Sequence, residues 1–183
     1  MSYDKDARIS TLPQYMSYLE SILDDDLYRI ISNLNNQPKL RVGTDCSGID
    51  APIQALKLMN VPFQYEFASD IDKAVKKSIN CNHQPRMFFD DIMTRDHTLL
   101  PNLDLYCAGF PCQSFSTLGK RQGFNDTKNR GTVFFHCYQT IKQTQPKMFI
   151  LENVKGLLSH NNGQTFKTIM DNLERLKGYF IHY

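Results

Sequence analysis

The chain has 183 residues, of which 41% are hydrophobic, so it is long enough for one domain with a substantial core and too short for two large ones. Its 21 Lys and Arg residues against 19 Asp and Glu residues give a net charge of +2, which neither requires nor excludes a polyanionic partner. The sequence contains no apolar run of the ~18 residues that a membrane span needs and no signal-peptide pattern. We therefore expect a cytoplasmic protein, or a nuclear one if its source is eukaryotic, that is neither secreted nor in a membrane.

The five cysteines form an odd set without a Cys-x-x-Cys pair. This pattern argues against a disulfide framework and against a zinc knuckle. The sequence therefore predicts reduced thiols and no bound metal.

The first part of the chain has the pattern of a separate helical element. Between Leu12 and Leu34 apolar residues recur at steps of three and four, which places one apolar stripe on a helix. Pro13 suits the first turn of that helix, and the run Asn-Leu-Asn-Asn-Gln-Pro at 33–38 indicates a break. We predict a helical extension over residues 1–38 and a main domain over residues 39–183.

In the main domain, short apolar runs alternate with segments of helical periodicity. The predicted strands span residues 40–44, 65–69, 87–89, 103–108, 148–151 and 179–183. The predicted helices span residues 52–59, 72–80, 132–145 and 164–177. This alternation predicts an α/β fold in which helices cover a parallel, doubly wound, Rossmann-like sheet. In such a fold ligands bind beyond the carboxyl ends of the strands, near the point where strand order reverses.

The strongest chemical signal is the segment 107–119, Cys-Ala-Gly-Phe-Pro-Cys-Gln-Ser-Phe-Ser-Thr-Leu-Gly. Its Gly-Phe-Pro-Cys-Gln core followed by Phe-Ser resembles the nucleophile signature of cytosine-5 DNA methyltransferases. These enzymes need a thiolate, because C5 of cytosine accepts a methyl group only after a nucleophile has added to C6. The resemblance implies that Cys112 is that nucleophile and that Pro111 helps to aim it. The alternative is a buried structural cysteine, which is the role we expect for Cys107.

A second match lies at 149–154, where Phe-Ile-Leu-Glu-Asn-Val resembles the Glu-Asn-Val strand end of the same family. The resemblance implies that Glu152, protonated or sharing a proton, binds N3 and the exocyclic amine of a flipped cytosine. It also implies that Asn153 holds the local turn. The alternative for Glu152 is a capping or surface carboxylate.

The resemblance further implies S-adenosylmethionine as the methyl donor, bound across the ends of the first three strands. The segment 44–51 aligns with the family's glycine-rich loop, usually Phe-x-Gly-x-Gly, but departs from it. Cys46 stands where Phe is usual, and Asp50 and Ala51 stand where glycines are common, so only Gly48 keeps the close-approach role.

Four further positions at the strand ends belong to the implied cofactor site. Asp70 matches the acid expected on the ribose hydroxyls, and Ile71 would lie against the adenine ring. The pair at 91–92 matches the residues that bracket the adenine amine, although an acid at a strand end can also be a helix cap. The predicted cofactor-binding residues are Asp45, Cys46, Ser47, Gly48, Ile49, Asp70, Ile71, Asp91, Ile92 and Gly109.

The polar stretch between Cys112 and Arg130 holds four basic residues against one acid, Asp126. It resembles the mobile loop that closes over DNA when a base is flipped. The alternative is an ordinary solvated loop. The predicted nucleic-acid contacts are Gln113, Ser116, Lys120, Arg121 and Arg130.

The resemblance runs from about residue 40 to Tyr183 and implies double-stranded DNA as the substrate. The family's later motifs, including its target-recognition region, have no counterpart here, so we expect a fold incomplete at its C-terminal side. A second subunit or a C-terminal fragment would then supply the remainder. Two alternatives stay open: a tRNA-methylating enzyme with the same core, and a catalytically silent or regulatory subunit.

Overall fold

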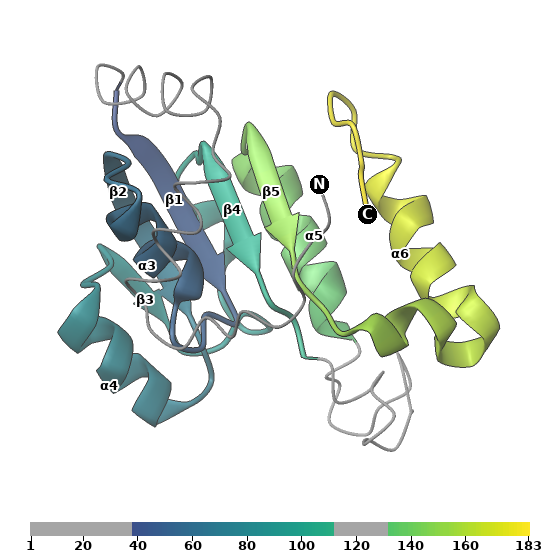
Figure 1. Cartoon of the computed structure of the whole chain (residues 1–183), viewed down its shortest axis with the longest axis horizontal. Coiled ribbons are helices and arrows are strands. Elements are labelled where there is room, and N and C mark those ends of the chain that lie inside the picture. The colour runs from purple at the N-terminus through teal and green to yellow at the C-terminus, as the bar shows by residue number, and fades with distance from the viewer. Residues whose placement is uncertain (1–37, 112–131) are drawn as a thin grey trace, which may run out of the picture.

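Five parallel strands and their connecting helices make up the described residues, 38–111 and 132–183, in a computed structural model (Figure 1). The strands are β1 (Leu40–Asp45), β2 (Phe63–Ser69), β3 (Met87–Phe89), β4 (Leu105–Ala108) and β5 (Met148–Leu151). They lie in the order β3-β2-β1-β4-β5, so the strand order reverses between β1 and β4. The predicted doubly wound α/β fold is confirmed.

Helices cover both faces of this sheet. They are α3 (Ala51–Leu58), α4 (Lys73–Asn82), η1 (His97–Leu99), α5 (Val133–Thr144), η4 (Lys155–Gly163) and α6 (Gln164–Leu173). The helices α3 and α4 pack on one face, and α5, with α6 beside it, packs on the other (Figure 1). Within the described residues, no helix combines the length and the apolar character needed to cross a membrane.

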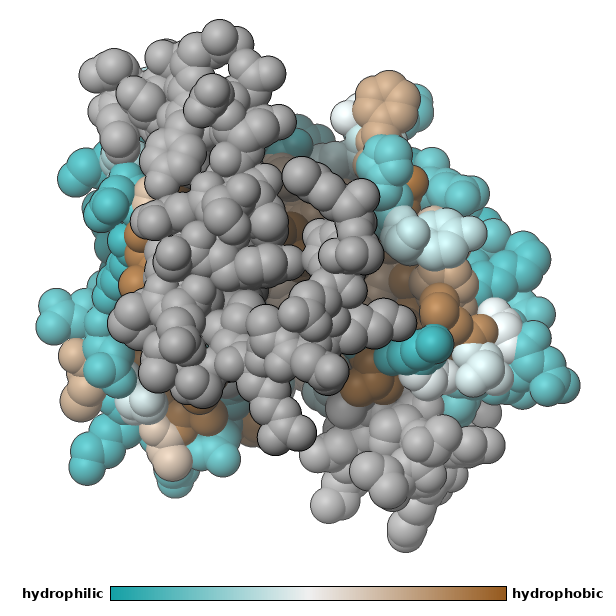
Figure 2. Space-filling model, viewed as in Figure 1, coloured by the Kyte–Doolittle hydropathy of each residue, from teal (hydrophilic) through white to brown (hydrophobic). Residues whose placement is uncertain are grey.

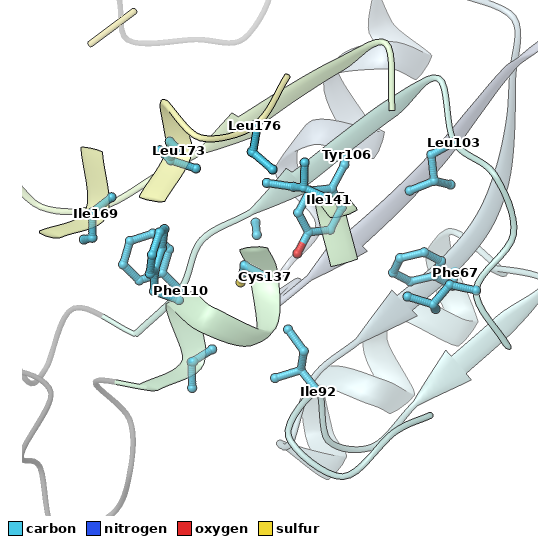
Figure 3. Close-up of a cluster of buried hydrophobic side chains, with 14 of the residues drawn as sticks. Phe67, Ile92, Leu103, Tyr106, Phe110, Cys137, Ile141, Ile169, Leu173 and Leu176 are labelled. Carbon is cyan, nitrogen blue, oxygen red and sulfur yellow. The ribbon is translucent and has the colours of Figure 1, made fainter. Parts of the chain in front are cut away.

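Strand β4 shows how the sequence supplies both cores. Leu105 and Cys107 belong to the cluster under α3 and α4, whereas Tyr106 and Ala108 belong to the cluster under α5 and α6. Side chains of a strand point to alternate faces, so a central strand with helices on both sides is apolar at every position. Figure 3 shows the larger cluster gathered between the sheet and the helices α5 and α6.

Within residues 38–111 and 132–183, helices cover only one face of strand β5. Phe149 and Leu151 pack against the core under α5 and α6, whereas Met148 and Ile150 are 54% and 52% exposed. A cavity of about 620 Å³ lies between β5, α6 and the end of the chain. Figure 2 shows hydrophobic surface on the side where α6 lies.

Two predicted elements differ from the structure by more than two residues. Residues 179–183 form no strand, because the Tyr179 ring packs on Phe149 and the Tyr183 ring on Phe166 while their backbone joins no ladder. The last helix ends at Leu173 rather than at residue 177. Beyond it, amides donate to carbonyls three residues back, as the Leu176 amide does to the Leu173 carbonyl.

The start of β4 lies two residues from its predicted position. This strand begins at Leu105 rather than at residue 103, because the Leu103 amide donates to the carbonyl of Thr144 at the end of α5. The other predicted elements agree with the structure within two residues. The predicted helical extension lies outside the described residues, apart from Pro38, so the domain boundary stays a prediction.

Candidate functional site

A cavity of about 550 Å³ lies at the strand ends, beside the point at which strand order reverses. This is the place and the size expected for a small-molecule site in a doubly wound sheet. Its lining residues are Cys46, Ser69, Asp70, Ile71, Asp91, Ile92, Met93, Gly109, Phe110, Pro111, Val133, Glu152 and Val154. Eight of them were predicted as site residues from the sequence.

Among the described residues that line this cavity, the charged groups are all acidic. Asp70 follows β2, Asp91 follows β3 and Glu152 follows β5, and no Lys, Arg or His is among the described residues that line the cavity. Carboxylates accept hydrogen bonds from hydroxyl and amine groups and attract a cation. The cavity therefore suits a ligand that carries hydroxyl or amino groups together with a positive charge.

The loop after β1 is tied to the end of β2. The Ser47 amide donates to the Ser69 carbonyl at 3.1 Å, and the Gly48 amide donates to Oδ2 of Asp70 at 3.0 Å. Gly48 has a φ of 54° with open space around its Cα, so glycine is favoured there by backbone conformation rather than by crowding. The loop thus holds the Asp70 carboxylate at the cavity wall.

Four residues of the predicted cofactor set do not line the cavity. Ser47 and Gly48 bond to the end of β2, and Ile49 is 82% exposed. The Asp45 carboxylate is buried beneath the cavity floor and pairs with Arg95. Direct contact of these four with a ligand stays a prediction from the resemblance.

Asn153 joins the ends of β4 and β5. Its Nδ2 donates to the Phe110 carbonyl at 3.0 Å, and its Oδ1 accepts from the Val154 amide at 2.9 Å. The Glu152 amide also donates to the Ala108 carbonyl at 2.9 Å. These bonds hold the segment that leads to residue 112 beside the Glu152 backbone.

Gly109 lies against the Glu152 side chain. A Cβ built at Gly109 would stand 3.3 Å from Oε2 of Glu152, so this carboxylate occupies the space that a side chain would fill. Glu152 is itself exposed at the cavity. A group entering the cavity above Gly109 can therefore meet the Glu152 carboxylate directly.

The predicted nucleophile and the residues predicted to contact DNA lie in the segment 112–131, outside the described residues. They are Cys112, Gln113, Ser116, Lys120, Arg121 and Arg130. Their roles stay predictions from the sequence. Pro111, the last described residue before them, lines the cavity.

Two of the described thiols lie near this site and are suited to a neutral state. Burial raises the pKa of the Cys46 thiol far above its ordinary value, with smaller contributions from Cys137 and Asp45. Burial also raises the pKa of the Cys107 thiol to about 12. Neither group is suited to act as a thiolate near neutral pH.

Sequence reasoning missed five lining residues: Ser69, Met93, Phe110, Val133 and Val154. Phe110, Met93 and Val154 each adjoin a predicted site residue, so their inclusion follows from widening each motif by one position. Val133 opens α5 and carries no signal in the sequence, because its place at the cavity depends on how α5 packs.

Comparison with known proteins agrees with this geometry. The profile of the family "C-5 cytosine-specific DNA methylase" matches residues 46–183. The chain is 36% identical over 173 residues to the type II methyltransferase M.HpaII of Haemophilus parainfluenzae. It is 43% identical over 135 residues to the orphan methyltransferase M.SPRI of Bacillus phage SPR. The chain therefore belongs to the C-5 cytosine-specific DNA methylase family.

These matches cover most of the chain but less than half of the relatives. They span 89% of this chain and 48% of M.HpaII, and 73% of this chain and 30% of M.SPRI. Among solved structures, Schizosaccharomyces pombe Dnmt2 methyltransferase matches with a TM-score of 0.49 and 20% identity, over 74% of this chain and 41% of that one.

Proposed function

We propose that this chain binds S-adenosylmethionine in the cavity at the strand ends and takes part in methylation of cytosine C5 in double-stranded DNA. The observation that carries the proposal is the convergence of Asp70, Asp91 and Glu152 on one cavity next to the segment that leads to Cys112. Since the chain spans less than half of its relatives' length, the complete reaction is proposed for the whole protein.

The cavity fits the proposed cofactor in size and in charge. Its volume of about 550 Å³ lies within the range of small-molecule sites. Asp70 would accept hydrogen bonds from the ribose hydroxyls, Ile71 would lie against the adenine, and Asp91 with Ile92 would bracket the adenine amine. When bound, S-adenosylmethionine would supply an electrophilic methyl group on a sulfonium, whose positive charge the acidic lining favours.

The residues of the chain would prepare the cytosine. The Cys112 thiolate would add to C6, forming a carbon–sulfur bond and giving C5 the electron density that accepts the methyl group. The Glu152 carboxyl would donate a hydrogen bond or a proton at N3 and accept from the exocyclic amine. Loss of the C5 proton and release of the thiolate would then restore the aromatic ring.

The substrate must leave the DNA stack to reach such a site. Flipping a base costs a few kcal/mol, which contacts in the closed complex must offset. Lys120, Arg121 and Arg130 are proposed to contact phosphates, with Gln113 and Ser116 near the base. A partner subunit or a further segment of the protein that carries target recognition is part of this proposal.

The test is covalent trapping on duplex DNA containing 5-fluorocytosine with S-adenosylmethionine, using wild type and Cys112→Ser. Fluorine cannot leave C5 as a cation, so the thiol adduct persists and shifts the mobility of the protein. Cys81→Ser is the matched control, because Cys81 is an exposed thiol near the C-terminal end of α4 and does not line the cavity. We expect an adduct with wild type and Cys81→Ser, and none with Cys112→Ser.

Cofactor binding without an adduct would favour the alternative of a silent or regulatory subunit. The trapping is therefore repeated with the downstream-encoded polypeptide added. An adduct on tRNA but not on DNA would show that the substrate is tRNA rather than DNA. Absence of both cofactor binding and adduct would refute the proposed function.

A further inference from the structure

A buried ion pair, Asp45 with Arg95, adjoins residues that line the cavity, and the contacts proposed for the cofactor and the cytosine do not use it. Arg95 donates from Nη1 to Oδ1 and from Nη2 to Oδ2 of Asp45, both at 2.6 Å. The two side chains are 2% and 0% exposed. The guanidinium also lies 5.0 Å from the ring centroid of Phe67 and 5.2 Å from that of Phe89.

Tyr106, Thr140 and His97 form further hydrogen bonds with the pair. The Tyr106 hydroxyl donates to Oδ2 of Asp45 at 2.7 Å, Thr140 Oγ1 accepts from Arg95 Nη2 at 2.5 Å, and His97 Nδ1 accepts from Arg95 Nε at 3.2 Å. A buried charge pair is tolerated when its geometry is bidentate and its further hydrogen bonds are satisfied. This pair therefore joins the end of β1 to β4, to α5 and to η1.

The pair connects two walls of the cavity. Asp45 directly precedes Cys46, which lines the cavity next to the loop of Ser47 and Gly48. Arg95 closes the turn that presents Asp91: its amide donates to the Asp91 carbonyl at 3.2 Å, while the Met93 amide donates to the Asp91 carboxylate at 2.8 Å. Asp91 and Met93 both line the cavity, whereas Asp45 and Arg95 do not.

We propose that Asp45 and Arg95 are positioning residues, whose ion pair sets the spacing between the β1 loop and the Asp91–Met93 wall and thereby the affinity for the cofactor. The inference rests on the proposed function, because it assigns these residues to the S-adenosylmethionine site. If the pair served stability alone, replacing both charges together would leave the affinity for the cofactor unchanged.

The decisive variant is Asp45→Leu with Arg95→Met. Removal of one partner leaves an unpaired buried charge, whereas replacement of both by apolar side chains of similar size restores or keeps stability. We expect the double variant to unfold in urea near the wild-type midpoint. Its Kd for S-adenosylmethionine, measured by titration calorimetry on the full chain, should rise about tenfold or more, since small errors of position are costly at a preorganised site.

Two single variants complete the series. Arg95→Lys keeps the charge but loses the bidentate geometry, so its affinity should lie between those of wild type and the double variant. Arg41→Met is the matched control: Arg41 pairs with Asp104 at 3.0 Å at the other end of β1, away from the cavity. It should lower stability without changing the Kd.

A double variant that folds and binds with the wild-type Kd would overturn the inference. If wild type itself does not bind S-adenosylmethionine, the proposed function fails, and hydrogen exchange then decides on positioning. The amides of Ser47, Gly48 and Met93 should exchange faster in the double variant while amides of β4 keep their protection. Unchanged exchange at those three amides would leave the pair with a role in stability only.

Discussion

Gly43 in β1 has no room for a side chain. A Cβ at this position would lie 2.5 and 2.7 Å from ring atoms of Phe67 and 2.9 Å from Leu103. The close approach lets the Phe67 ring lie directly against β1 while it also contacts the guanidinium of Arg95. At this residue, the absence of a side chain shapes the core directly beneath the site.

Gly43→Ala should destabilise the fold by about 1–3 kcal/mol, because overpacking forces strands or rings to shift. Urea unfolding monitored by circular dichroism measures the change. Gly43→Ala combined with Phe67→Leu should recover part of the loss, since the smaller side chain removes the closest contact. A Gly43→Ala protein as stable as wild type would contradict the packing described here.

Asp50 is a buried carboxylate whose environment favours its neutral form. It accepts a hydrogen bond from the Tyr65 hydroxyl on Oδ2, while Oδ1 has no partner among the described residues. Burial raises the pKa of Asp50 above its ordinary value of 3.8, and the Tyr65 hydroxyl opposes this in part. Ionisation of Asp50 therefore lowers the stability of the folded state.

The sign of the resulting pH dependence follows from the raised pKa. The neutral Asp50 carboxyl contributes its full share of stability below its pKa in the unfolded chain, near 3.8. This share is lost as the pH rises through the higher pKa of Asp50 in the folded protein. Asp50→Asn resembles the neutral acid, so its stability relative to wild type should increase with pH. Urea unfolding of both proteins from about pH 4 to about pH 8 tests this, and a pH-independent difference would refute it.

At the scale of elements, short polar links at the strand ends position the site. Asp72 is the N-cap of helix α4, and its side chain accepts from the Ala74 amide at 2.7 Å and the Val75 amide at 3.3 Å. The Asp72 amide donates in turn to Oδ1 of Asp70. The start of α4 and the carboxylate at the cavity wall are thus parts of one turn.

Asp72→Ala should cost about 1 kcal/mol of stability, the usual effect of losing an N-cap. Asp72→Ser is the control, because its hydroxyl can accept the same bonds and should keep most of that stability. Thermal unfolding distinguishes the two variants. Equal losses in both would show that the side chain contributes through its charge rather than through capping.

At the scale of the whole molecule, one face of β5 stands out among the described residues because no helix covers it. Met148 and Ile150 point to that open face, and Phe149 and Leu151 point into the core under α5 and α6. Exposed apolar groups on an edge strand promote association. Within the described part of the chain, this surface therefore favours self-association.

Ile150→Lys should raise solubility and reduce light scattering, with a stability change within about 0.5 kcal/mol, as for an exposed position. Leu151→Lys, one residue further on the opposite face, should lose about 2 kcal/mol or more, because its apolar contacts are part of the core. Comparable losses in both variants would mean that the Ile150 face is covered in solution.

Most strands of the sheet follow from local patterns in the amino-acid sequence. Short apolar runs between helical segments predicted them, since every position of a doubly covered strand such as β4 must be apolar. The positions of these runs also predicted that the acids at 70, 91 and 152 follow strand ends. The prediction of a strand at 179–183 was wrong because an aromatic-rich run has the composition of a strand, whereas its tyrosines pack as a tail.

The amino-acid sequence by itself determined the fold class and the family resemblance, because these depend on local patterns and on residue types. The chemistry assigned to Cys112 and Glu152 stays a prediction from that resemblance. Only the tertiary structure decided that Asp45 pairs with Arg95, that Val133 lines the cavity and that no helix of the described residues covers the Met148 and Ile150 face of β5. The physical reason is distance along the chain: Asp45 and Arg95 are brought together by packing of separate elements, which no local pattern encodes.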